Sequence, residues 1–303
     1  MRREGRRRTH REPDGRRLKV ADGRTLGYAE YGDLAGWPLV YLHGFPGSRL
    51  AGGVLDRAAR AAGVRVLAPE RPGLGLFSPR PRRTLLDHAR DILELAQALG
   101  IERFAVLGES GGGPYALAIA HALPEQVECA AIVCGLGPVH CPGWTDGLAV
   151  KERIGYAIAG RAPLLAGRVL FPIGAWARRR SRTFLRVTRW QLGPADREVL
   201  CGPLGELVAA DFAEAFRKGS RGVGRDLAPL FEPWPFHPAA VAVPVLFFHG
   251  TDDRTVSLAA TSSLAERMPG ARLEVAEGHG HFSLLAREGE SVLRAVAAAR
   301  RRS

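Results

Sequence analysis

Short apolar runs recur along the first half of the chain, and stretches with helical apolar spacing separate them. The runs are almost wholly apolar, which is typical of strands that are buried on both faces of a parallel sheet. They lie at 39–42, 64–68, 104–107 and 127–134. The helical stretches lie at 50–62, 84–99 and 114–123. Strand and helix alternating in this way predict an α/β fold, with a mostly parallel central sheet and helices on both of its faces.

Local signals mark where some of these elements begin and end. Thr84, with Asp87 three residues later, is the expected N-cap of the helix that follows, and Gly100 is its expected end. Near the start of the chain, an Asp-Gly pair separates two strand-like pieces at 18–20 and 24–31. Such a pair between short strands predicts a β-hairpin.

The alternation breaks at residue 138 and resumes near residue 241. Residues 138–240 are rich in arginine and proline and show no clear alternation. Beyond them we predict strands at 243–248 and 273–276, and helices at 258–268 and 288–299. We therefore expect an α/β core at 18–137 and 241–303, interrupted by a helical cap at 138–240. Residues 1–17 are polar throughout and are expected to form a disordered, arginine-rich arm.

The pentapeptide Gly108-Glu109-Ser110-Gly111-Gly112 follows a predicted strand and precedes a predicted helix. It matches the G-x-S-x-G pattern of a nucleophile elbow, a strained turn that holds a serine hydroxyl above the sheet. Glycines flank the serine because side chains there would clash with the adjoining strand and helix. The backbone N–H of Gly111 then points into the site. The alternative is a glycine-rich turn whose serine has no chemical role.

A second loop, His43-Gly44-Phe45-Pro46-Gly47-Ser48, follows another predicted strand. Such a loop can supply a second N–H donor, expected from Phe45, that stabilises a tetrahedral oxyanion together with Gly111. We interpret His43 as a residue that braces this loop rather than as a base. A phosphate-binding loop is the competing interpretation, but it would require a Lys-Ser/Thr pair that is missing here.

A nucleophilic serine needs a base, and the base needs an acid that orients it. The acid candidates are Asp252 and Asp253, which follow the predicted strand at 243–248. The base candidates are His279 and His281, which follow the last predicted strand. Both loops leave the carboxyl ends of strands, which is the edge where open α/β sheets build their sites.

These motifs together resemble the α/β-hydrolase fold family, in particular its capped serine esterases and proline-iminopeptidase-like members. The resemblance covers about residues 18–300. It rests on HGFPGS at 43–48, ERPGLG at 70–75, GESGGGPYALAIAHALPEQV at 108–127, HGTDDRTV at 249–256 and GHGHF at 278–282. The family order of serine, aspartate and histidine is kept. Glu70 and Phe77 depart from the usual Asp and Ser of the family.

The resemblance implies Ser110 as nucleophile, Asp253 as acid and His281 as base. The usual acid loop reads G-x-x-D-x-x-V, which places its aspartate at Asp253 and leaves Asp252 as the alternative. The usual base follows a glycine and precedes a bulky residue, which favours His281 over His279. We expect a serine hydrolase that cleaves a small carboxylic ester or amide through an acyl-serine intermediate, without a metal or an organic cofactor.

Three other functions fit the same motifs. One is an aminopeptidase of the proline-iminopeptidase type, which would bind the substrate amine with an acidic residue of the cap, the candidates being Glu206, Asp211 and Glu214. Another is a hydrolase that cleaves carbon–carbon bonds. The last is a non-catalytic receptor that binds a small ligand on the same scaffold.

The cap also contains large apolar residues, which either line an acyl pocket or attach the cap to the core. They are Trp144, Leu164, Leu165, Phe171, Trp176, Phe184, Trp190 and Trp234.

The net charge of +12 invites a nucleic-acid interpretation, but its distribution argues against one. Eight of the twelve charges lie in residues 1–17 and 300–302, and no basic stripe is interleaved with base-stacking aromatics. We therefore expect a small-molecule substrate and no specific nucleic-acid partner.

None of the four cysteines forms a CxxC pair. The chain contains neither the apolar segment of a signal peptide nor a run of 18 apolar residues, so we expect a cytoplasmic location and no transmembrane segment.

Overall fold

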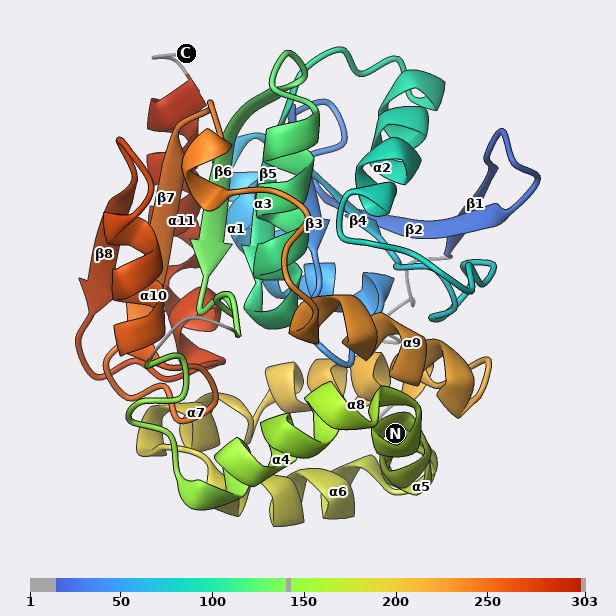
Figure 1. The fold of residues 1–303 in the computed structure, drawn as a ribbon, viewed down its shortest axis with the longest axis vertical. Helices are drawn as coiled ribbons and strands as arrows, with labels where there is room; N and C mark the ends of the chain where they lie inside the picture. Colours follow the sequence, from blue (N-terminus) through green and yellow to red (C-terminus); the bar gives the residue numbers. More distant parts are fainter. Residues whose placement is uncertain (1–14, 140–142, 301–303) are drawn as a thin grey trace, which may run out of the picture.

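The computed structural model describes residues 15–139 and 143–300. Its centre is an eight-stranded sheet with the order β1-β2-β4-β3-β5-β6-β7-β8 (Figure 1). The pairs β1/β2 and β2/β4 are antiparallel, and the neighbours from β4 to β8 are parallel. The strands are β1 (Arg16–Lys19), β2 (Thr25–Gly32), β3 (Trp37–Leu42), β4 (Val64–Pro69), β5 (Phe104–Glu109), β6 (Val127–Val133), β7 (Val245–Gly250) and β8 (Arg272–Ala276).

Helices cover both faces of this sheet, as predicted. One face packs against α1 (Asp56–Ala62) and α11 (Ser283–Arg300), and the other against α2 (Asp87–Ala98), α3 (Gly113–Ala122) and α10 (Leu258–Glu266). The apolar runs of β3, β5 and β6 are buried because helices cover both faces of the sheet at these central strands.

Several predicted boundaries are corrected by the structure. The predicted helix at 50–62 is a 3-10 helix over Arg49–Leu55 followed by α1, and the predicted strand at 243–248 is Val245–Gly250. Strand β1 begins at Arg16, so Arg16 and Arg17 pair with β2 instead of belonging to the arm; residues 1–14 of the predicted arm lie outside the described residues. Helix α2 begins at Asp87 rather than at Thr84, since residues 85 and 86 form a turn; the Asp87 carboxylate accepts bonds from the N–H and hydroxyl of Thr84 at 2.7 and 3.1 Å. Helix α11 begins at Ser283, five residues before the predicted start.

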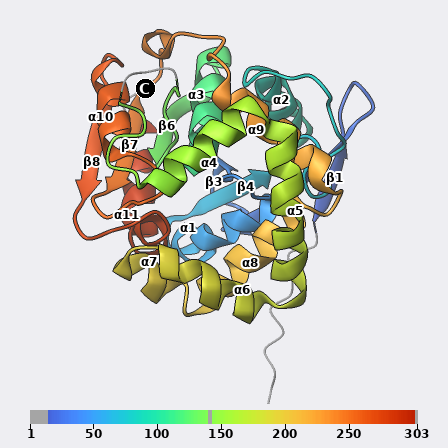
Figure 2. The ribbon, with the colours of Figure 1, turned by 60° about the horizontal axis from the view of Figure 1, so that its bottom comes forward.

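The segment between β6 and β7, hereafter the insertion (residues 143–240), is built mainly from helices. It leaves and re-enters the sheet at neighbouring parallel strands, and its helices gather below the carboxyl edge of the sheet in Figure 1 and come forward in Figure 2. Its α-helices are α4 (Val150–Arg161), α5 (Pro163–Arg179), α6 (Ser181–Thr188), α7 (Pro194–Val199), α8 (Pro203–Ala215) and α9 (Ser220–Phe231). Within the described part of the chain, no helix is both long and apolar enough to cross a membrane.

Candidate active site

Ser110 lies at the sharp turn between β5 and α3. Its φ of +52° is in the left-handed region, which a residue with a side chain rarely adopts, so the turn is strained at the serine. Glycines on either side make the turn possible. A Cβ atom at Gly108 would lie 2.4 Å from the carbonyl oxygen of Gly112, and one at Gly112 would lie 2.0 Å from that of Leu42. The local geometry is that of the predicted elbow.

The loop after β3 lies directly against this elbow. A Cβ atom at Gly111 would be 3.3 Å from the backbone nitrogen of Phe45, and one at Gly44 would be 3.3 Å from Cβ of Ser110. The structure thus brings together the two residues, Phe45 and Gly111, that were predicted to donate to an oxyanion.

His281 and Asp253 form a buried pair on the other side of the site. Nδ1 of His281 is 2.8 Å from Oδ2 of Asp253, and the two side chains are 5% and 0% exposed. The other oxygen of Asp253 accepts the backbone N–H groups of Thr255 and Val256 at 2.7 and 3.0 Å. The carboxylate is therefore fixed, and so is the imidazole ring that it binds.

The alternative residues in both loops are placed elsewhere. Asp252 is exposed, and its backbone N–H binds the carbonyl of His279. The ring of His279 lies 3.8 Å from Glu288 rather than near an aspartate. The structure therefore pairs Asp253 with His281 and leaves Asp252 and His279 out of the pair.

The two members of this pair shift each other's pKa in opposite directions. Burial disfavours the charged form of each side chain. The attraction between them outweighs burial, so the pKa of His281 lies above its ordinary value and the pKa of Asp253 lies below it. Such a carboxylate stabilises an imidazolium, which a histidine that accepts a proton from serine must become.

Cys134 and His249 lie behind Asp253, and the three side chains place possible metal-binding atoms within 4.8 Å of one another. Their hydrogen bonds favour support of the acid over binding of a metal. The two ring nitrogens of His249 lie 3.2 Å from the carbonyl of Val256 and 2.9 Å from the hydroxyl of Thr261. Burial raises the pKa of the Cys134 thiol well above its ordinary value, which disfavours the thiolate that would bind a metal.

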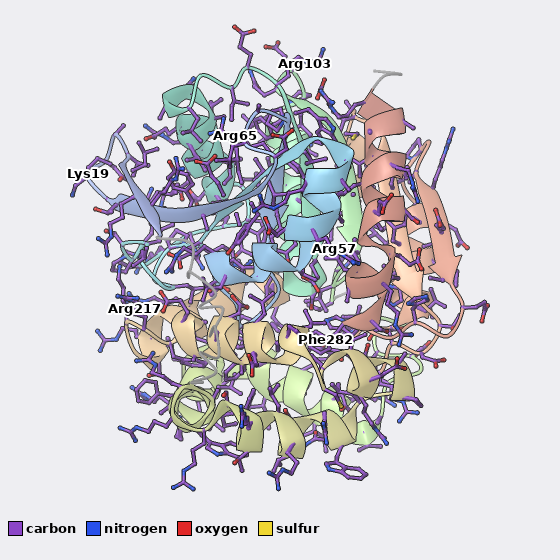
Figure 3. All side chains as sticks on the ribbon, turned by 180° about the vertical axis from the view of Figure 1, so that it is seen from behind. Lys19, Arg57, Arg65, Arg103, Arg217 and Phe282 are labelled. Atoms are coloured by element: carbon purple, nitrogen blue, oxygen red, sulfur yellow. The ribbon has the colours of Figure 1, made fainter. Side chains whose placement is uncertain are left out.

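Ser110 and His281 line one cavity of about 400 Å³ between the core and the insertion. Phe282, labelled in Figure 3, lies at the level where these two parts meet and also lines the cavity. The insertion contributes a mainly apolar wall that includes Ile173, Phe184, Leu185, Leu204, Leu207 and Phe212. Site and cavity thus lie at the carboxyl ends of the strands, as expected for an open α/β sheet.

A sequence model of the α/β hydrolase fold matches residues 38–288. The chain belongs to the α/β hydrolase fold family. The predicted fold class and family resemblance are therefore confirmed.

Two curated relatives match most of this α/β-hydrolase chain. It is 28% identical over 287 residues to a non-heme chloroperoxidase of Streptomyces lividans, an alignment that covers 88% of this chain and 93% of the relative. It is 30% identical over 258 residues to a 2-hydroxymuconate semialdehyde hydrolase of Pseudomonas sp. (strain CF600), with 82% of each chain covered.

Among solved structures, an esterase from Exiguobacterium antarcticum superposes with a TM-score of 0.67 at 20% identity. The superposition covers 95% of this α/β-hydrolase chain and 99% of the esterase. At this identity, the likeness shows a shared fold.

Of the large apolar residues singled out in the insertion, Phe184 lines the cavity of this α/β-hydrolase. Trp176 contacts Phe184 edge-on with ring centroids 5.6 Å apart. Trp144 packs with Tyr156 and Phe231, whereas Trp190 is 67% exposed. The apolar wall comes mostly from leucines that the sequence did not distinguish from other apolar residues.

Three acidic side chains also line the cavity of the α/β-hydrolase, those of Glu109, Glu152 and Asp211. Glu109, next to the serine, binds the hydroxyl of Tyr41, and burial raises its pKa. One oxygen of Asp211, on α8, accepts the N–H and hydroxyl of Ser48 at 2.7 and 2.6 Å and the N–H of Ala51 at 3.1 Å. Burial raises the pKa of Asp211 to about 7, although these hydrogen bonds oppose the shift.

The other two acidic residues considered as amine ligands do not line the cavity. Glu206 is exposed on α8, and Glu214 binds Arg49 at 2.7 Å.

The ERPGLG segment of the α/β-hydrolase supports the loop of residues 43–48, the predicted oxyanion loop. Arg71 is fully buried and donates to the carbonyl oxygens of His43 and Gly44 at 2.5 and 2.9 Å. It also forms a double hydrogen bond with Asp226 of α9, with both distances 2.8 Å. The motif alone does not indicate this role for Arg71, because its partner Asp226 lies 155 residues away along the chain.

The two departures from the family pattern are both buried. Glu70 binds Arg49 at 2.6 Å and accepts the N–H of Leu76, and Phe77 packs in the core. Neither residue lines the cavity.

Proposed function

We propose that the protein is a serine hydrolase that cleaves a small carboxylic ester or amide through an acyl-Ser110 intermediate. The observation that carries the proposal is one cavity lined both by a serine in a strained left-handed turn and by a histidine whose ring is bound to a buried aspartate. A nucleophile, a base and an oriented acid are the three groups that acyl transfer of this kind requires. The insertion acts as a cap that covers this site.

The proposed reaction has two halves. Ser110 attacks the substrate carbonyl while His281 accepts the serine proton, and the N–H groups of Phe45 and Gly111 stabilise the oxyanion. The intermediate then collapses, and the leaving alcohol or amine takes the proton from His281. In the second half, a water molecule gives a proton to His281 and attacks the acyl-serine. Collapse of that intermediate releases the acid and restores the serine hydroxyl.

The cavity wall indicates the chemistry of the substrate. Its insertion side is mainly apolar, and a volume of about 400 Å³ suits a small molecule. Polar groups of both kinds also line it, namely the carboxyl groups of Glu109, Glu152 and Asp211 and the guanidinium of Arg254, so the apolar wall is what indicates the substrate. We expect neutral esters with an apolar acyl or alcohol group to be the best substrates. No metal or organic cofactor takes part in these steps, and specific nucleic-acid binding is not needed for them.

Intact-mass measurement after treatment with a fluorophosphonate tests this proposal directly. The wild-type protein should gain the mass of a single adduct, because an activated serine attacks phosphorus as it attacks a carbonyl. Ser110→Ala should gain none. A folded wild-type protein without an adduct would contradict the hydrolase function and favour the non-catalytic receptor, which equilibrium binding of small apolar ligands would then test.

A second candidate function, an aminopeptidase, is favoured by Asp211. Its carboxylate lines the cavity, and one of its oxygens holds the oxyanion loop while the other has no hydrogen bond among those described. Turnover of an aminoacyl amide and of its N-acetylated form distinguishes the two functions. An aminopeptidase should cleave only the free amine, and Asp211→Asn should raise its KM. An esterase should tolerate or prefer the acetylated form.

Cleavage of carbon–carbon bonds is a third candidate function, because one curated relative is a 2-hydroxymuconate semialdehyde hydrolase. Incubation with a vinylogous 1,5-diketone, followed by mass spectrometry of the products, would test this reaction on the same protein preparation.

A further inference from the structure

A buried aspartate of the insertion holds the loop that carries His281. Asp196 lies on α7 and is 1% exposed. One of its oxygens accepts the backbone N–H of His281 at 2.9 Å. The other accepts the N–H groups of Phe282 and Ser283 at 3.0 and 2.9 Å. A single carboxylate thus binds three consecutive N–H groups where the loop enters α11. The dipole of α11 also favours a negative charge at this end of the helix.

The loop is shaped to admit this carboxylate. A Cβ atom at Gly280 would lie 2.5 Å from an oxygen of Asp196, so a side chain at this position would displace the carboxylate. The N–H of Gly280 binds the hydroxyl of Ser283 at 2.8 Å. Each of the four residues 280–283 therefore donates its N–H to a fixed acceptor.

His281 is thus held by two aspartates from different parts of the molecule. Asp253, from the core, binds its ring, and Asp196, from the insertion, binds its backbone. The ring meets a substrate at a constant place when both the ring and its own backbone are held, and Asp253 binds only the ring.

We propose that Asp196 is a positioning residue for His281, so that the insertion completes the geometry of the base in addition to covering the cavity. The inference rests on the proposed role of His281 as the base. A displacement of about 1 Å at a reacting group costs on the order of 100-fold in rate. The loss of Asp196 should therefore slow the reaction of Ser110 without changing any group that touches the substrate.

The charges around His281 supply a readout that a purely structural role would not change. Asp253 follows β7, Glu109 ends β5, Asp196 lies on α7, and His249 lies on β7 beside Asp253. Asp253 has the largest favourable influence on the imidazolium, and Glu109 and Asp196 add to it. Removal of the Asp196 charge should therefore lower the pKa of His281 and move the pH dependence of serine reactivity to lower pH.

The test compares Asp196→Asn with Glu198→Gln. Asparagine keeps one acceptor oxygen but turns an N–H donor toward the loop. Glu198 lies on the same helix, is 77% exposed and pairs with Arg287 of α11 at 2.8 Å, so Glu198→Gln removes a charge between the same two helices at the surface. For each protein, the rate constant of fluorophosphonate labelling at Ser110 is measured from pH 5 to 10, and folding is followed by thermal unfolding.

We expect Asp196→Asn to lower the plateau rate constant on the order of 10- to 100-fold and to shift the acid limb to lower pH. Glu198→Gln should match the wild type. Rates and a pH profile for Asp196→Asn equal to the wild type would overturn the proposal. If Asp196→Asn does not fold, Gly280→Ala, which displaces the carboxylate without removing its charge, decides the question by the same rate measurement. A wild-type protein that is not labelled at all contradicts the hydrolase function instead.

Discussion

The core and the insertion use buried acidic residues for different purposes. In the core, Asp253 and Glu109 face the candidate reacting groups, and Asp253 binds the ring of His281. In the insertion, Asp196, Asp211 and Asp226 bind backbone N–H groups or arginines of the core loops. The core therefore supplies the candidate reacting groups, and the insertion carboxylates bind or brace the loops that carry them.

Apolar packing differs between the same two regions. Among the residues that the structure describes, nine of the eleven exposed large apolar side chains belong to the insertion, including Val150, Val169 and Trp190, whereas the buried clusters of the sheet are extensive. A region that buries less apolar surface gains less stability from it. The insertion depends more on its buried polar contacts with the core, and single substitutions can test this dependence.

The largest effect is expected at the core acid. Asp253→Asn should lower kcat for an ester substrate about 10⁴-fold, because asparagine does not stabilise the imidazolium and permits the wrong tautomer of His281. Steady-state kinetics with a chromogenic ester measures the loss. The neighbouring exposed Asp252→Asn should keep at least half of the activity, and a comparable loss there would show that the acid had been assigned wrongly.

The next effect concerns stability and the insertion. Asp226→Ala leaves Arg71 and Arg83 buried without their shared carboxylate, and breaking a buried pair in this way costs about 3–5 kcal/mol. Urea denaturation measures the free energy of unfolding. Glu232→Gln, an exposed charge at the end of α9, is the matched control and should change it by less than about 0.5 kcal/mol. Equal effects of the two substitutions would mean that the Asp226 pair does not anchor the insertion.

A smaller effect, on pH dependence, links the two regions at His281. The base must be neutral, so kcat/KM should rise with pH through a pKa above the ordinary value of 6.5, because the nearby carboxylates stabilise the imidazolium. The same raised pKa affects stability in the opposite direction, because the stabilising contribution of the pair falls as pH rises. The protonated pair stabilises the protein fully below pH 6.5, and this contribution is lost as pH rises through the pKa of His281. An acid limb of the kcat/KM profile centred below pH 6.5 would contradict a raised pKa of His281.

The smallest effect is expected at Asp211. Its pKa of about 7 exceeds the 3.8 of an ordinary aspartate, so the folded protein binds the proton more tightly and loses stability as pH rises from about 4 to 7. Asparagine keeps the oxygen that accepts all three described bonds and cannot ionise. Asp211→Asn should therefore be more stable than the wild type at pH 8 but not at pH 4. Asp211→Ala, which loses the acceptor, should be destabilised at both.

Most of the core could be predicted because its signals are local. Apolar runs without a solvent-facing side indicate buried parallel strands, and Gly63 and Gly100 follow α1 and α2 with positive φ angles, as expected at helix ends. The spacing of the acid loop likewise selected Asp253 over Asp252, and the structure pairs this residue with His281. The catalytic role of the pair stays a prediction.

The insertion was poorly predicted because its structure depends on contacts that are distant along the chain. Proline occurs inside α5 and α9, at Pro172 and Pro229, where a local pattern predicts interruption of the helix. The role of Asp196 depends on residues 85 to 87 positions later. No spacing rule connects such residues, since only the folded arrangement of α7 against the start of α11 brings them together.

The place of the insertion between β6 and β7 also orders the events of synthesis. A nascent chain that has reached residue 240 already contains Ser110, the loop of Phe45 and the whole insertion, but neither Asp253 nor His281. Asp196 is made before the N–H groups that it will bind. The proposed nucleophile therefore remains without its proposed base until β7, β8 and the start of α11 have left the ribosome, so we expect chains that end prematurely to carry a serine that nothing activates.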